Sequence, residues 1–190
     1  SWRTGGNLNT ARYGMGGAGI KTAALAFGGD TGTTTAVTEL YNGSSWTEVN
    51  DLNTARLLYT GNAGSQTAAL AFGGASPSFT GATETWNGTN WTEVNDLSTT
   101  GARTGVGTNT AALAFGGFNP GGLIADTETW NGTNWTEVNN LNTAKDQRGG
   151  AGIQTSALAF GGGPATAATE SWNGTNWTTV NSMNTARYAL

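Results

Sequence analysis

Two side chains that often carry chemistry are missing from this chain, which has neither cysteine nor histidine among its 190 residues. Without cysteine the chain forms no disulfide and no thiolate metal site. Without histidine it lacks the usual general base near neutral pH and the commonest metal ligand. We therefore expect no catalytic residue, no metal site and no cofactor.

Charge is also scarce. The chain has 12 acidic and 8 basic residues and a formal net charge of −4. A nucleic-acid-binding protein would present a basic face, so we expect no nucleic-acid partner. No run of about 20 apolar residues occurs, and we therefore expect no insertion into a membrane. No signal-peptide pattern is visible either.

Glycine and tryptophan, in contrast, are abundant. The sequence has 31 glycines and 8 tryptophans but only 3 prolines. Enrichment in glycine and threonine is compatible with disorder. Tryptophans at regular positions between apolar segments favour a packed β structure instead.

One phrase rich in tryptophan and asparagine occurs four times. It reads ETWNGTNWTEVND at 84–96 and ETWNGTNWTEVNN at 128–140, with looser copies at 39–51 and 170–182. The segments ALAFGG and NTAR, or close variants, recur with it in constant order, about every 45 residues. A fixed period of this size indicates a repeat architecture. We predict four units, which span 9–52, 53–97, 98–141 and 142–183.

Each unit reads as four short strands. In the second strand Leu25 and Phe27 share one face, and Ala24 and Ala26 share the other. Both faces are apolar, so the strand belongs to a sheet that is covered on both sides. A glycine-rich first strand within 11–20 fits nearest a crowded central axis.

The repeated Asn-Gly dipeptide predicts a hairpin between the third and fourth strands. A two-residue type I′ turn needs positive φ at both positions, which Asn and Gly tolerate. The segments that follow the second strand vary in length and content. We expect these four spacers to be surface loops, and they span 30–37, 75–82, 118–126 and 163–168.

Four antiparallel strands in a repeat of about 45 residues are typical of a β-propeller blade. The large face of one blade then fills the small face of the next. We predict an all-β propeller with four full blades and partial blades at 1–8 and 184–190. The partial blades would pair with further repeats of the chain or with other copies. A stacked β-solenoid, whose repeats are usually shorter, is the alternative.

The markers of each unit together resemble the kelch repeat, in which a Gly-Gly pair ends an apolar strand and an aromatic residue and a tryptophan follow. The glycine pairs are Gly28-Gly29, Gly73-Gly74, Gly116-Gly117 and Gly161-Gly162; the aromatic pairs are Tyr41 with Trp46, Trp86 with Trp91, Trp130 with Trp135, and Trp172 with Trp177. NTAR is similar to the entry of a kelch blade. The resemblance implies a propeller that serves as a binding platform. The copper site of galactose-oxidase relatives needs histidine and cysteine, which this chain lacks.

Acidic and basic residues recur once per unit and invite a catalytic interpretation. The acids are Glu39, Glu84, Glu128 and Glu170 on the third strand, and Glu48, Glu93 and Glu137 on the fourth; the cations are Arg12, Arg56, Arg103, Lys145 and Arg187. Glycoside hydrolysis needs two carboxylates in one cleft, whereas these acids take equivalent positions around a ring. We expect structural pairs, in which each cation binds an acid or a carbonyl group. A ring of cations that grips an anion is the alternative.

The repeated tryptophans and asparagines suggest two further hypotheses, the binding of sugars and N-glycosylation. Exposed tryptophans stack on sugars, but their fixed positions favour a core between the blades. Asparagines in the hairpin phrase match the N-glycosylation pattern, although the turn already explains them. They are Asn42, Asn87, Asn131 and Asn173, together with Asn90, Asn134 and Asn176.

The leading hypothesis is a non-enzymatic structural and binding propeller in an extracellular or virion-surface assembly, with an oligomer or a filament as its working form. The second hypothesis is a lectin-like propeller that binds carbohydrate or a protein ligand through its spacers, where Phe79, Phe118 and Asn119 are the candidate contacts. A glycoside hydrolase is the third.

Overall fold

The computed structural model describes residues 5–189, whose main strands form four separate four-stranded antiparallel sheets. No helix occurs among these residues, hence none that would cross a membrane. The first sheet contains β1 (Gly16–Ile20), β2 (Ala23–Phe27), β3 (Thr38–Tyr41) and β4 (Trp46–Val49). The second contains β5 (Asn62–Ser65), β6 (Ala68–Phe72), β9 (Thr83–Trp86) and β10 (Trp91–Val94). The third contains β11 (Ala102–Gly107), β12 (Ala112–Asn119), β13 (Gly122–Trp130) and β14 (Trp135–Val138). The fourth contains β15 (Gly149–Ile153), β16 (Ser156–Phe160), β17 (Thr169–Trp172) and β18 (Trp177–Val180).

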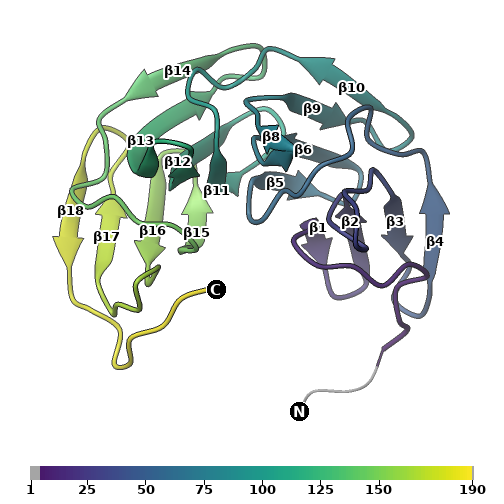
Figure 1. The fold of residues 1–190 in the computed structure, drawn as a ribbon, viewed down its shortest axis with the longest axis horizontal. Coiled ribbons are helices and arrows are strands. Elements are labelled where there is room, and N and C mark those ends of the chain that lie inside the picture. Colours follow the sequence, from purple (N-terminus) through teal and green to yellow (C-terminus); the bar gives the residue numbers. More distant parts are fainter. Residues whose placement is uncertain (1–4, 190) are drawn as a thin grey trace.

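The four sheets are the blades of a β-propeller (Figure 1), and we number them 1 to 4 along the chain. The first strands β1, β5, β11 and β15 lie innermost, and the fourth strands lie at the rim. The first strands are rich in glycine because they approach one another closely. A Cβ atom on Gly105, for example, would lie 2.4 Å from the ring of Phe72 in the preceding blade. The expected all-β propeller fold is therefore confirmed.

Blades 1, 2 and 3 each bury their large face against the small face of the next blade. Leu70 and Phe72 of blade 2 pack against Ala112 and Ala114 of blade 3 in one core cluster. The same arrangement joins blade 1 to blade 2 and blade 3 to blade 4. Each fully buried leucine or phenylalanine contributes roughly 1.5–3 kcal/mol to stability. The alternation of small and large side chains along ALAF therefore gives each blade an alanine face and a leucine–phenylalanine face, and the two fit each other between neighbouring blades.

Six tryptophans belong to these interfaces, as the sequence predicts. Trp86 and Trp91 face each other across their hairpin, with ring centroids 5.4 Å apart, and are 0% and 6% exposed. Their counterparts in blades 3 and 4 are buried to the same degree. Trp46 of blade 1 is only half-buried, and Trp2 lies outside the described residues.

The hairpin tip differs from the predicted two-residue turn. Asn87 to Asn90 form a four-residue connection, in which only Gly88 has a positive φ, of 95°. The side-chain oxygen of Asn87 accepts hydrogen bonds from the backbone N–H groups of Thr89 and Asn90. The asparagine therefore shapes the tip through its side chain and not through a left-handed backbone.

Two spacers are more ordered than the predicted surface loops. In blade 3 the spacer continues the hairpin, because β12 extends to Asn119 and β13 begins at Gly122. In blade 2 the spacer forms a small hairpin of its own, β7 (Ala75–Ser76) with β8 (Ser78–Phe79). The first strands, in contrast, are shorter than the expected 11–20, since β1 begins at Gly16.

The ring of blades is open between blade 4 and blade 1 (Figure 1). Residues 1–4 of the partial blade expected at 1–8 lie outside the described residues, and residues 5–8 contain no strand. Near the other end, Arg187 forms an isolated bridge with Thr166 of blade 4. The strands at the two ends of the ring therefore belong to blades 1 and 4, and Gly6 lies against blade 1, where it accepts from Trp46.

Candidate functional site

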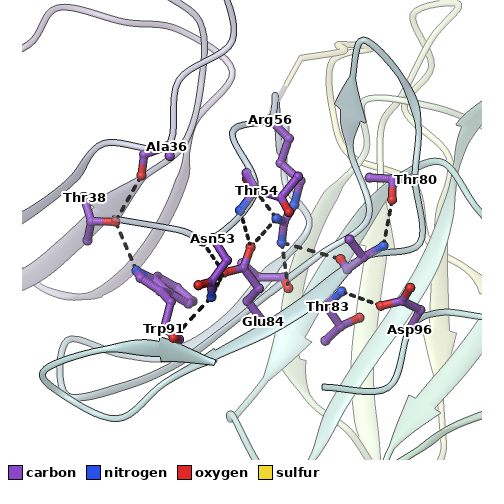
Figure 2. A network of polar contacts seen from close by, with 12 residues as sticks. Ala36, Thr38, Asn53, Thr54, Arg56, Thr80, Thr83, Glu84, Trp91 and Asp96 are labelled. Atoms are coloured by element: carbon purple, nitrogen blue, oxygen red, sulfur yellow. Dashed lines mark hydrogen bonds and ion pairs between the residues drawn. The ribbon is translucent and has the colours of Figure 1, made fainter. Parts of the chain in front are cut away.

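The recurring acids of the third strands are bound inside the blades. In blade 2 one oxygen of Glu84 accepts from Arg56 at 2.5 Å, and its other oxygen accepts from the backbone N–H of Asn53 at 2.7 Å (Figure 2). The backbone N–H of Thr54 adds a third bond. The side chains of Arg56 and Glu84 are both 0% exposed. Glu84 therefore anchors the segment that enters its own blade, as a structural pair requires.

All four blades contain this ion pair, but its arginine comes from different positions in the repeat. Blades 1 and 2 use the arginine of NTAR, and the ion pairs are Arg12–Glu39 and Arg56–Glu84. Blades 3 and 4 use a later arginine, in the pairs Arg103–Glu128 and Arg148–Glu170.

The assignment of Lys145 to this set was therefore wrong. Its carbonyl group accepts from the second glycine of the preceding pair, as the carbonyl of Arg56 does. Lys145 thus occupies the NTAR backbone position, while the guanidinium that reaches Glu170 belongs to Arg148. Arg187 also occupies that backbone position, and its side chain is exposed.

Burial and neighbouring groups shift the pKa of two members of these ion pairs, Glu39 and Arg103. Burial acts to raise the pKa of Glu39, but hydrogen bonds from Arg12 and from the backbone of Asn9 and Thr10 outweigh it, and the pKa is lowered. Burial lowers the pKa of Arg103, against the opposing pull of Glu128 and Asp126. Glu39 is therefore held as a carboxylate that accepts hydrogen bonds.

The acids of the fourth strands lie on the surface of the blades. Glu48, Glu93 and Glu137 are exposed, and each lies directly opposite the buried glutamate of its own blade. Within residues 5–189 no group of three or more acidic side chains is placed to hold a metal ion. The recurring carboxylates are thus distributed one blade at a time and do not meet in a cleft.

A pocket of about 650 Å³ lies where the entry segments of all four blades converge. Aromatic side chains form much of its lining: Tyr13 of blade 1, Tyr59 of blade 2, and the spacer residues Phe79 and Phe118. The rings of Phe79 and Phe118 meet edge to face, with centroids 5.6 Å apart. The two phenylalanines that the sequence singled out thus come from different blades and contact each other.

Polar groups and strained backbone complete the pocket. Asp146 and Gln147 from the entry of blade 4 line it, as does the buried Arg103. Three non-glycine residues among those described have a positive φ, namely Tyr59, Gln147 and Ala189, and all three line this pocket. Such conformations cost about 1–3 kcal/mol each and concentrate at functional sites. The pocket is therefore our candidate site.

Sequence reasoning found only part of this pocket. Asn119 is half-buried beside Phe118 but does not belong to the lining. Tyr13, Tyr59, Asp146 and Gln147 were missed, although all four lie within three residues after NTAR or NTAK, where the units differ from one another. Positions that vary in an otherwise faithful repeat are the ones free to form a single site.

Other candidate positions lie away from the pocket. The hairpin asparagines Asn42, Asn87, Asn131 and Asn173 are all exposed. The glycine pairs serve the joints between units, since Gly74 donates its backbone N–H to the carbonyl group of Gly101 in the next unit. A Cβ atom on Gly74 would lie 2.1 Å from the carbonyl oxygen of Leu57, so only glycine fits there.

The fold places the chain in the class of β-propeller proteins. No protein-family model matches the sequence, and no curated protein matches it either.

Proposed function

We propose that the chain is a non-enzymatic structural and binding propeller of the kelch type, which works in an extracellular or virion-surface assembly. The proposal rests on a difference between the residues that recur in every blade and the residues that do not. The ionisable groups that recur in every blade are paired inside the blades or point to solvent. The residues that differ between blades converge on one aromatic pocket. Such a pocket suits binding, because each of its four aromatic residues occupies a different position in the repeat.

The kelch assignment rests on the glycine pairs and the aromatic pairs. Both glycines of each pair have a positive φ, for example 65° at Gly73 and 99° at Gly74. The second glycine then bonds to the entry of the next unit. The motif that suggests the family therefore has a physical reason in this chain.

A carbohydrate is the second candidate, as the ligand of a lectin-like propeller, because the pocket combines aromatic faces with polar side chains. Phe118 and Tyr59 are 40% and 42% exposed, which leaves ring surface for the apolar face of a sugar. Asp146 and Gln147 supply acceptors and donors for hydroxyl groups. A volume of about 650 Å³ is typical of small-ligand sites, which range from about 300 to 1,000 Å³.

A glycan array tests this second candidate. We expect reproducible binding of at least one saccharide by the unmodified chain. Binding is lost in Phe118→Ala and in Phe79→Ala, because each change removes a ring from the pocket. Ile20→Ala is the matched control, since Ile20 is 67% exposed and lies outside this pocket.

Two results would contradict carbohydrate binding at this site. One is an array without signal. The other is binding that survives both phenylalanine changes while circular dichroism shows that the variants are folded. A lectin that uses another surface would give the second result and would leave the non-enzymatic propeller itself untouched.

A further inference from the structure

The two end blades expose the halves of an interface that the molecule makes three times internally. On blade 4 the large face is uncovered, and Leu158 is 42% exposed. Its counterparts Leu25, Leu70 and Leu113 are at most 1% exposed. On blade 1 the small face is uncovered, and Trp46 is half-buried where Trp91 is 6% exposed.

The polar contacts of the internal interfaces have matching groups on the two end faces. The indole N–H of Trp91 donates to the hydroxyl oxygen of Thr38 in the preceding blade, and this bond recurs at the next two interfaces. On the end faces the corresponding residues are Trp46 on blade 1 and Thr169 on blade 4. The indole N–H of Trp46 donates to the carbonyl oxygen of Gly6 instead.

A second contact occurs at the first and third interfaces. The side chain of Gln66 on blade 2 donates to the carbonyl oxygens of Ala24 and Tyr41 on blade 1. Gln154 of blade 4 does the same toward blade 3. Blade 1 has Lys21 at this position, which is also a donor and is exposed. The small face of blade 1 thus keeps the donor that a preceding blade would need.

We propose that the opening receives one further blade of the same repeat design, which packs on both end faces. Its alanine face and tryptophan lie against Leu158 and Thr169 of blade 4. Its leucine and phenylalanine lie against blade 1, with a threonine hydroxyl that accepts from Trp46. A second copy of the four-blade ring does not fill the opening in this way, because each of its end blades already has one face covered.

The sequence itself provides a fitting test. NTARYAL at 184–190 matches NTARYGM at 9–15, so residues 16–52 are appended directly after Leu190 to form a fifth repeat. The extended chain begins at Asn9, because Gly6 lies against Ser44 as Asn50 lies against Thr89, where the end of the fifth repeat would lie. We expect the extended chain to unfold in one cooperative transition, with a melting temperature several degrees above that of the original chain. The total tryptophan fluorescence shifts to shorter wavelength than in the control extension described below, because the new blade buries Trp46.

The matched control carries the same extension with Ala24→Glu and Ala26→Glu in the appended copy only. Charges on its small face prevent packing on Leu158, so the extension remains sensitive to protease and the melting temperature stays unchanged. Leu158→Glu in blade 4 of the extended chain removes the same gain while the four original blades remain folded.

Two outcomes overturn the proposal. One is an unmodified extension that is cleaved as fast as the control extension. The other is a stable dimer of the original 190-residue chain in light scattering that Leu158→Glu dissociates, because a second copy would then cover the end faces.

Discussion

Blades 1 and 2 make the same ion pair as blades 3 and 4, but by different routes. In blade 2 the pair joins Arg56 of NTAR to Glu84 at 2.5 Å, and Arg56 also donates to three backbone carbonyl oxygens. In blade 4 the pair joins Arg148, three positions beyond Lys145, to Glu170 at 3.2 Å, and no other bond from Arg148 occurs among the described residues.

This difference shows that the position of the glutamate in the repeat is fixed, whereas the position of the arginine is not. The glutamate is buried at one fixed place, where an unpaired carboxylate would be costly. The glutamate needs a cationic partner, but the position in the repeat that supplies this partner is not fixed. A guanidinium has a long side chain and several donors, so it reaches the same carboxylate from two directions.

The largest effect is expected when the constrained partner is removed. Glu84→Ala leaves Arg56 charged and buried without its carboxylate, and it frees the backbone N–H groups of Asn53 and Thr54. We expect a loss of about 3–5 kcal/mol in the free energy of unfolding, measured in urea. Glu93→Ala is the control, because Glu93 lies opposite Glu84 but is exposed. Its effect stays within about 0.5 kcal/mol. Equal effects of the two changes would refute the anchoring role of Glu84.

A smaller effect is expected at the arginine that comes from the later position. Arg148→Ala destabilises less than Arg56→Ala, because Arg148 makes a longer ion pair and fewer hydrogen bonds. Adding Lys145→Arg to Arg148→Ala then restores stability, since Lys145 has the backbone position of Arg56. Urea unfolding of the three variants measures both steps. Lack of rescue would show that the two routes are not interchangeable.

The smallest effect is a dependence on pH in blade 1. The pKa of Glu39 is lowered in the folded chain, so its pairing stabilises the fold above the pKa of the unfolded chain, about 4.3. That contribution is lost as the pH falls through the lower folded value. The difference in unfolding free energy between the native chain and Glu39→Gln is therefore largest at neutral pH and shrinks below about pH 4. A difference that does not change with pH would contradict this interpretation.

Regularity made much of the fold predictable from the sequence. The alternation of Leu25 and Phe27 with Ala24 and Ala26 predicted the face-to-face packing of blades, because an apolar strand with one large and one small face needs such a neighbour. The repeated tryptophans predicted the buried interfaces for the same reason. Both predictions rest on a pattern that all four units repeat.

Features that belong to a single unit were predicted less well. Arg148 was missed because alignment by NTAR directs attention to Lys145, and alignment does not register how far a guanidinium reaches. The ordered spacer of blade 3 was missed because Asn119-Pro120-Gly121-Gly122 suggests a loop, although it turns a hairpin. Phe79 and Phe118 were identified as contacts, but their meeting depends on how blades 2 and 3 sit side by side.

The three interfaces between blades use nearly the same residues, which has a consequence for how the chain folds. The leucine face of blade 1 matches the alanine face of blade 4 as well as that of blade 2, so recognition alone does not set the order of the blades. The short connections along the chain set it, because each blade meets its sequence neighbour first. Nearly identical units also invite misassembly between neighbouring molecules at high concentration. Slow, dilute refolding is therefore the condition under which this ring forms in register.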